Sequence, residues 1–203
     1  MKLPQKKIPL PRAILFDMDG TLTQPILDFP RLKAEMGIGT EPILEALAKM
    51  EGARRESALA ILERFEEQAA AESTLNPGCR ELLEWINQQK LGIALITRNS
   101  RRSVRTFLQR HPLPIDILIT REDGPFKPSP VPLGKACKSL KVSPGEAWMV
   151  GDGRYDVEAG HAAGIATVWI SHGRERAFPA EPWIVVADLF ELAKLLQECH
   201  SDP

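Results

Sequence analysis

The sequence has few cysteines, almost no net charge and no long apolar run, and each absence excludes a class of protein. Its three cysteines are widely spaced, which fits neither a disulfide framework nor a paired zinc site, so we expect a reducing, cytoplasmic compartment. The 26 basic and 27 acidic side chains nearly cancel, so we expect no nucleic-acid or membrane partner and only local anion binding. No segment is long enough to span a bilayer, and the first residues lack the apolar stretch of a signal peptide.

Short β-type runs alternate with helical patterns along most of the chain. This order is typical of a doubly wound, Rossmann-like α/β fold with a parallel sheet covered on both faces. The expected strands are 13–16, 92–97, 115–119, 147–150 and 165–170, with 183–186 as a short edge strand. The expected helices lie near 78–89, 100–110, 130–141, 155–163 and 188–199.

One segment interrupts the alternation, because only helical spacing is found between Thr23 and about Asn76. We expect a small all-helical cap domain at 23–76, inserted after the first strand. Residues 12–22 and 77–203 would then form the α/β core, and residues 1–11 an extended N-terminal tail rich in proline. The insert is interpreted as a lid with hinges near 23–25 and 74–78, and a rigid helical subdomain is the alternative.

Two carboxylates, Asp17 and Asp19, follow the first apolar run directly. In an open α/β sheet, ligands bind outside the carboxyl ends of the strands, so both should stand at a site. Adjacent anions repel unless a cation lies between them or one is protonated, and both conditions suit metal-assisted transfer of an anionic group. A turn of the type Asp-x-Asp-Gly without chemistry is the alternative.

Other strand ends carry further polar groups. Thr97 and Arg98 precede a helix, whose N-terminal amides favour phosphate. Lys127 lies in a loop stiffened by prolines, and Asp152 and Asp156 follow the fourth main strand. Read singly, Thr97 could be a plain strand end, Lys127 a solvated lysine, and the two aspartates helix caps. The stretch 171–176 after the fifth strand could border the same edge, but we leave it out of the predicted site.

Together these features resemble the haloacid dehalogenase-like hydrolase superfamily. The signatures that carry the resemblance are Asp17-Met18-Asp19-Gly20-Thr21-Leu22, Thr97, Lys127, and Gly151-Asp152 with Asp156. They span nearly the whole chain in the order of that family. The helical insert resembles the cap of the phosphoglycolate phosphatase-like branch, although it is somewhat short for that cap, which predicts a more open pocket.

The resemblance implies a phosphatase acting on a small phosphorylated metabolite through an aspartyl-phosphate. Asp17 would be the nucleophile, and Asp19 would protonate the leaving alkoxide and then activate water. Magnesium would be the cofactor, held by the side chains of Asp17 and Asp152, the backbone carbonyl of Asp19, and Asp156 directly or through water. Thr97 and Lys127 would bind the phosphate. Arg98 is not part of the family signatures, but its place directly after Thr97 predicts that it also binds phosphate or a second anionic group of the substrate. Asp19 separates phosphatases and mutases of the family from its dehalogenases and phosphonate hydrolases, which lack this carboxylate.

Three other interpretations stay open. A sugar-phosphate mutase of the β-phosphoglucomutase type shares all four signatures, and a catalytically silent fold could act as a binding protein. The arginines between 98 and 110 could recognise nucleic acid or a phosphoprotein, but a solvated helix face is the simpler interpretation. We expect a monomer or a homodimer.

Overall fold

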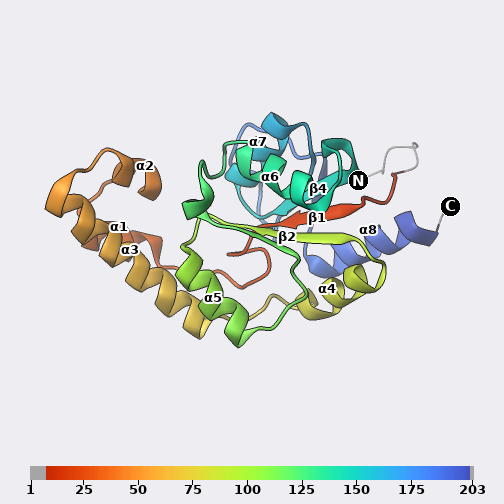
Figure 1. The fold of residues 1–203 in the computed structure, drawn as a ribbon, viewed down its shortest axis with the longest axis horizontal. Helices are drawn as coiled ribbons and strands as arrows, with labels where there is room; N and C mark the ends of the chain where they lie inside the picture. Colours follow the sequence, from red (N-terminus) through yellow and green to blue (C-terminus); the bar gives the residue numbers. More distant parts are fainter. Residues whose placement is uncertain (1–7, 202–203) are drawn as a thin grey trace. The chain divides into compact units, whose positions relative to one another are not determined.

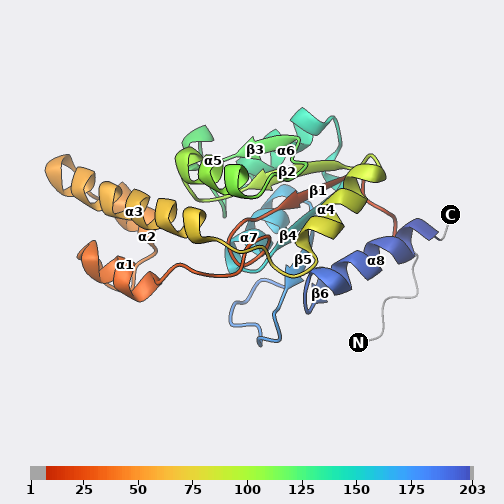
Figure 2. The same cartoon turned by 90° about the horizontal axis from the view of Figure 1, so that it is seen from below.

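The computed structural model describes residues 8–201, and residues 1–7 of the expected N-terminal tail lie outside this range. Its centre is a six-stranded sheet in which every neighbouring pair is parallel, in the order β3-β2-β1-β4-β5-β6. Figure 1 labels the central strands, and Figure 2 labels the outer strands as well. The strands are β1 (Ala13–Phe16), β2 (Gly92–Ile96), β3 (Ile117–Ile119), β4 (Ala147–Gly151), β5 (Ala166–Ile170) and β6 (Ile184–Val186). The strand order grows outward in both directions from β1, so the topological switch point lies between β1 and β4. The prediction of a doubly wound α/β fold is confirmed.

The register aligns the carboxyl ends of the central strands. Phe16, the last residue of β1, pairs with Leu95 of β2 on one side and Val150 of β4 on the other. All four residues of β1 are buried, as expected for a strand covered on both faces of a parallel sheet. The residues that follow β1, β2 and β4 therefore emerge side by side at one edge.

Two helices cover each face of this sheet. Figure 1 shows α6 (Val131–Leu140) and α7 (Arg154–Ala163) above β1, and α4 (Cys79–Gln88) and α8 (Leu189–Ser201) below it. The apolar side chains of both strand faces and helices form the core. Within the described residues, no helix combines the length and the apolar character needed to cross a bilayer.

The chain divides into two compact units. One contains the sheet and the four helices just described, and its described residues are 8–24, 75–98 and 113–201. The other is purely helical and combines residues 25–74 with residues 99–112. Its helices are α1 (Phe29–Glu35), α2 (Ile43–Ala48), α3 (Gly52–Glu72) and α5 (Arg101–Arg110).

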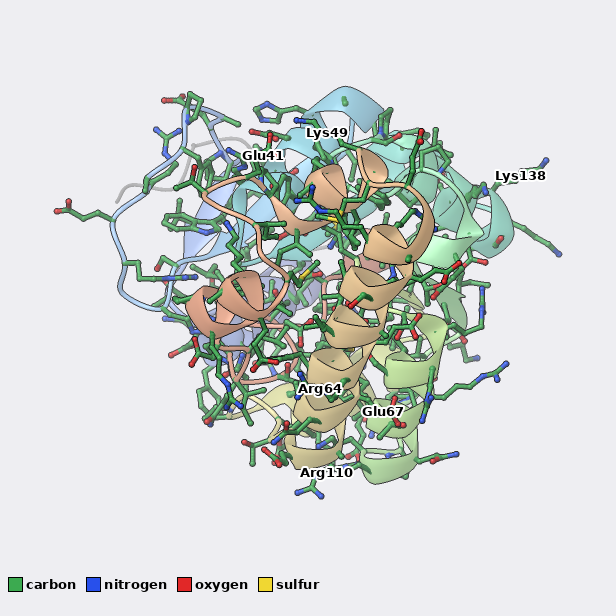
Figure 3. The ribbon with its side chains drawn as sticks, turned by 90° about the vertical axis from the view of Figure 1, so that its left-hand side faces the viewer. Glu41, Lys49, Arg64, Glu67, Arg110 and Lys138 are labelled. Carbon is green, nitrogen blue, oxygen red and sulfur yellow. The ribbon has the colours of Figure 1, made fainter. Side chains whose placement is uncertain are left out.

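In the helical unit, the long helix α3 lies along α5 (Figures 1 and 2). Thr106 of α5 donates to Glu67 Oε1 at 2.6 Å, and Arg110 donates to the carbonyl oxygen of Ser73 at 2.8 Å. Figure 3 shows Glu67 and Arg110 along this pair of helices. The sequence boundaries assign 100–110 to the α/β core, whereas α5 packs within the helical unit.

The buried face of α3 includes a charged residue. Ala58, Leu62, Glu66 and Ala69 are buried, whereas the apolar residues Leu59 and Phe65 are only half-buried. Glu66 accepts a hydrogen bond from the backbone N–H of Ser100, the N-cap of α5, at 3.1 Å. The carboxylate replaces an apolar residue on this face because it satisfies a helix-end donor.

Candidate active site

The loop after β1 folds back immediately behind the first two candidate residues. The backbone N–H groups of Thr21, Leu22 and Thr23 all point to the carbonyl oxygen of Met18, at 2.9 to 3.3 Å. Gly20 adopts a φ of +78°, which favours glycine, and a Cβ there would lie 2.4 Å from Asp152 Oδ2. The tight turn therefore brings the loops after β1 and β4 into direct contact.

Lys127 is the central cation of the site. Its side chain is 1% exposed, and its Nζ donates to Asp17 Oδ1 at 2.6 Å and to Asp156 Oδ1 at 2.7 Å. Burial alone would lower the pKa of Lys127, but attraction by Asp156 and Asp17 outweighs it and raises that pKa above its ordinary value. The lysine is therefore held as an ammonium ion between two carboxylates.

Three carboxylates converge at this point. Ligand oxygens of Asp17, Asp152 and Asp156 all lie within 4.8 Å of one another. Burial, followed by repulsion from Asp156 and Asp152, raises the pKa of Asp17 well above its ordinary value, although Lys127 opposes this effect. Burial and Asp156 likewise raise the pKa of Asp152.

The backbone fixes the position of Asp156. Its Oδ2 accepts from the Gly153 N–H at 3.1 Å, at the start of α7, where negative charge is favoured. A Cβ at Gly151 would lie 2.2 Å from Asp156 Cγ, so only glycine leaves room for this carboxylate. Asp152 and Asp156, which are four residues apart in the sequence, therefore both reach the carboxylate cluster.

This donor set fits a hard divalent cation. Three carboxylates face the ammonium of Lys127 and the guanidinium of Arg174, which leaves an excess of negative charge among oxygen ligands. Oxygen-rich carboxylate sites suit Mg²⁺. The side chain of Asp19 is not one of the three that converge, and its predicted metal contact uses the backbone carbonyl.

Thr97 and Arg98 follow β2 at the same edge. Thr97 is buried, and its N–H donates to the carbonyl oxygen of Ile119 at 3.0 Å. Arg98 donates from Nη1 to the carbonyl oxygen of Lys127 at 2.8 Å. Both predicted phosphate ligands thus belong to the sheet edge that carries the carboxylates.

Two supporting side chains were missed in the segment 171–176, which the sequence interpretation left out. Arg174 donates from Nη2 to Asp152 Oδ2 at 2.9 Å. His172 Nε2 lies 2.6 Å from the carbonyl oxygen of Gly20, which can only accept. The signal for both was their place after β5, since the carboxyl end of that parallel strand lies at the same edge.

Asn76 was also missed. Its side chain is buried, and its Nδ2 donates to the carbonyl oxygens of Thr21 at 2.8 Å, Thr23 at 3.0 Å and Gly20 at 3.3 Å. The sequence analysis treats this position only as the end of the helical insert and part of a predicted hinge at 74–78. In the structure, Asn76 holds the loop that follows Asp17 and Asp19.

Comparison with known proteins assigns this arrangement to a family. The profile described as "Haloacid dehalogenase-like hydrolase" matches residues 29–170, which is more than half of the chain. The chain belongs to the haloacid dehalogenase-like hydrolase family. The resemblance inferred from the motifs is therefore confirmed, and with it the prediction of a hydrolase enzyme.

Relatives support the same family. The chain is 33% identical to a haloacid dehalogenase-like hydrolase domain-containing protein of Arabidopsis thaliana over 170 residues, covering 77% of this chain and 69% of the relative. It is 31% identical to a phosphoglycolate phosphatase of Pseudomonas savastanoi pv. phaseolicola over 215 residues, covering 90% of this chain and 79% of the relative. These matches place this haloacid dehalogenase-like hydrolase in the phosphoglycolate phosphatase-like branch.

A solved structure shares the fold. The crystal structure of a hydrolase from Pseudomonas syringae has a TM-score of 0.79 and 21% sequence identity, covering 92% of this chain and 98% of that chain. At this identity the likeness concerns the fold alone. It shows that this haloacid dehalogenase-like hydrolase shares its overall fold with a protein of known structure.

Proposed function

We propose that this chain is a magnesium-dependent phosphatase that hydrolyses a small phosphate monoester through an aspartyl-phosphate intermediate. The observation that carries the proposal is the buried Lys127 ammonium in contact with Asp17 and Asp156, beside Asp152. Similarity to proteins named phosphoglycolate phosphatase supports the phosphate monoester as substrate class. The three free cysteines agree with a cytoplasmic location.

Asp17 is the proposed nucleophile because it combines a strand-end position with charge partners. One carboxylate oxygen attacks phosphorus as the bond to the leaving oxygen breaks, which transfers the phosphoryl group to Asp17. Asp19 gives its proton to the departing alkoxide. It then takes a proton from water, whose attack on phosphorus releases inorganic phosphate and restores the Asp17 carboxylate.

Phosphate binding at this edge requires positive charge, since the substrate carries about two negative charges near neutral pH and meets three carboxylates. Lys127 supplies one fixed ammonium, and the hydroxyl of Thr97 and nearby backbone amides hold the phosphate oxygens. Asp17, Asp152 and Asp156 would hold Mg²⁺ together with the carbonyl of Asp19. When bound, this ion offsets charge at the phosphate and keeps the Asp17 carboxylate ionised.

The test is release of inorganic phosphate from p-nitrophenyl phosphate by the purified full-length chain. We expect turnover with MgCl₂, none after EDTA, and recovery when magnesium is restored. Asp17→Asn should abolish both turnover and the acid-stable phosphoenzyme, whereas the control Asp188→Asn, an exposed helix cap, should match the wild type. Multiple turnover by Asp17→Asn would remove the nucleophile assignment.

A panel of phosphorylated metabolites then identifies the substrate. Phosphoglycolate belongs in it because relatives carry that name. Hexose 1-phosphate with a trace of hexose bisphosphate tests the mutase alternative. Isomerised sugar phosphate without released phosphate would replace the phosphatase proposal by a mutase.

A further inference from the structure

Arg98 is engaged by two aromatic rings and one carbonyl group. Its guanidinium carbon lies 3.9 Å from the ring centroid of Tyr155 and 4.9 Å from that of Phe126. Its Nη1 donates to the carbonyl oxygen of Lys127 at 2.8 Å. The side chain is half-buried, so these contacts are partly shielded from water.

These contacts of the Arg98 side chain reach the two segments that carry the charged centre. Phe126 directly precedes Lys127, and Tyr155 directly precedes Asp156 on the first turn of α7. Arg98 itself follows β2. One guanidinium therefore links the end of β2, the lysine loop and the start of α7.

The contacts are suited to fixing geometry. A guanidinium is planar and stacks on aromatic faces, and cation–π attraction grows when the pair is desolvated. The hydrogen bond to a main-chain oxygen acts on the Lys127 backbone itself. The same loop must place Lys127 Nζ within 2.7 Å of carboxylates from β1 and α7.

We propose that Arg98 is a positioning residue, which braces the Lys127 loop against α7 and so places the ammonium between Asp17 and Asp156. The proposal rests on the proposed function, since it assigns a role in that same site. It replaces the phosphate contact that is predicted for Arg98 from its position directly after Thr97. The decisive property is the simultaneous contact of one guanidinium with two aromatic rings and a carbonyl oxygen, which a positive charge alone does not supply.

The test compares Arg98→Ala, Arg98→Lys, Tyr155→Leu and the double variant Arg98→Ala/Tyr155→Leu on p-nitrophenyl phosphate with MgCl₂. We expect each single variant to lower kcat between about tenfold and a hundredfold, the range for a misplaced catalytic group, with KM changed less than about threefold. The kcat of the double variant should be no lower than that of the less active single variant, because either change alone already removes the same brace. Arg98→Lys should not restore kcat.

Two controls separate the brace from general damage. Tyr155→Phe keeps the aromatic face, so its kcat should stay near the wild-type value. Arg102→Ala removes an exposed arginine of α5 and should leave kcat and KM unchanged. Circular dichroism of each variant checks that the fold is intact.

A substrate ligand would behave differently. A rise in KM for Arg98→Ala with kcat unchanged, reversed by Arg98→Lys and absent in Tyr155→Leu, would overturn the proposal. Chemical unfolding of the wild type, Arg98→Ala, Tyr155→Leu and the double variant tests the brace independently of turnover. The brace predicts that the effects of the two single changes on the free energy of unfolding are non-additive. Additive effects would overturn the brace, whereas absent wild-type turnover would remove the proposed function alone.

Discussion

The single positive charge of Lys127 forms ion pairs with two carboxylates, and these pairs determine the geometry of the site at the scale of single residues. Its ammonium contacts Asp17 and Asp156, while Asp152 is paired with Arg174. Removing one member of such a buried set leaves the others with unpaired charge. The three aspartates are therefore not equivalent, because Asp17 and Asp156 share Lys127 whereas Asp152 pairs with Arg174.

Asp19 should matter in proportion to the basicity of the leaving group. We predict that Asp19→Asn lowers single-turnover phosphoryl transfer from an alkyl phosphate by about a hundredfold or more, because the alkoxide then departs without a proton donor. Transfer from p-nitrophenyl phosphate should fall far less, since nitrophenolate leaves unprotonated. Rapid-quench measurement of product formation distinguishes the two substrates. Equal losses on both would contradict the proton-donor role.

Single glycines decide how closely the elements approach. A Cβ at Gly160 of α7 would lie 2.0 Å from Thr167 Oγ1 of β5, whereas nothing lies within 4 Å of one at Gly134 of α6. We predict that Gly160→Ala lowers the free energy of unfolding by about 1–3 kcal/mol through overpacking. Gly134→Ala should raise it by about 0.5–1 kcal/mol, because alanine has the higher helix propensity.

Urea unfolding of both variants measures these changes. Adding Thr167→Ala to Gly160→Ala should recover part of the loss, because the clash involves that hydroxyl. If the double variant were less stable than Gly160→Ala, the contact would not be the cause.

Glu146, in the turn before β4, makes the stability of the fold depend on pH. Hydrogen bonds from the Ser143 N–H, from Arg12 and from the Ser143 hydroxyl lower the pKa of Glu146 from 4.5 to about 2. A lowered pKa means that the ionised carboxylate stabilises the fold above about pH 4.5, and that this contribution is lost as the pH falls through about 2. Glu146→Gln should therefore lower the thermal midpoint at neutral pH but not near pH 2.

Thermal unfolding across the pH range checks this prediction. Glu56→Gln, which changes an exposed glutamate of α3, is the control and should track the wild type. A difference between Glu146→Gln and the wild type that stays constant down to pH 2 would contradict the assigned cause.

Sequence patterns located the elements well because a buried parallel strand is a short apolar run. The boundaries of β1 are those expected, whereas β3 begins two residues late, after the side-chain carboxylate of Asp116 has accepted the Ile93 N–H at 2.8 Å. The position of Asp17, Lys127 and Asp152 after strands also predicted that they lie at one edge of the sheet, where the structure brings them together. Arg174 escaped prediction because periodicity carries no information on the direction of a loop side chain.

At the scale of the whole molecule, metal binding should couple to stability. The converging carboxylates of Asp17, Asp152 and Asp156 repel one another, so a bound cation favours the folded state. We predict that MgCl₂ at about a hundred times its dissociation constant raises the thermal midpoint by about 5 °C or more. Asp152→Asn should abolish most of this rise.

Differential scanning fluorimetry with KCl at matched ionic strength as the control measures the effect. Equal shifts with KCl and MgCl₂ would show that the acidic cluster holds no specific divalent ion. This readout is independent of turnover and so tests the metal site by itself.

The helical unit is made from two separate stretches of sequence, since α5 completes it. Exchanging only residues 25–74 would remove Glu66 and Glu67, and with them the acceptors of the Ser100 N–H and the Thr106 hydroxyl, unless the new segment carries acceptors at both positions. A chimaera without such acceptors must also import 99–112. Diversification of this unit is therefore constrained at two places in the gene, because a change at Glu66 or Glu67 alters a hydrogen bond to residues 99–112.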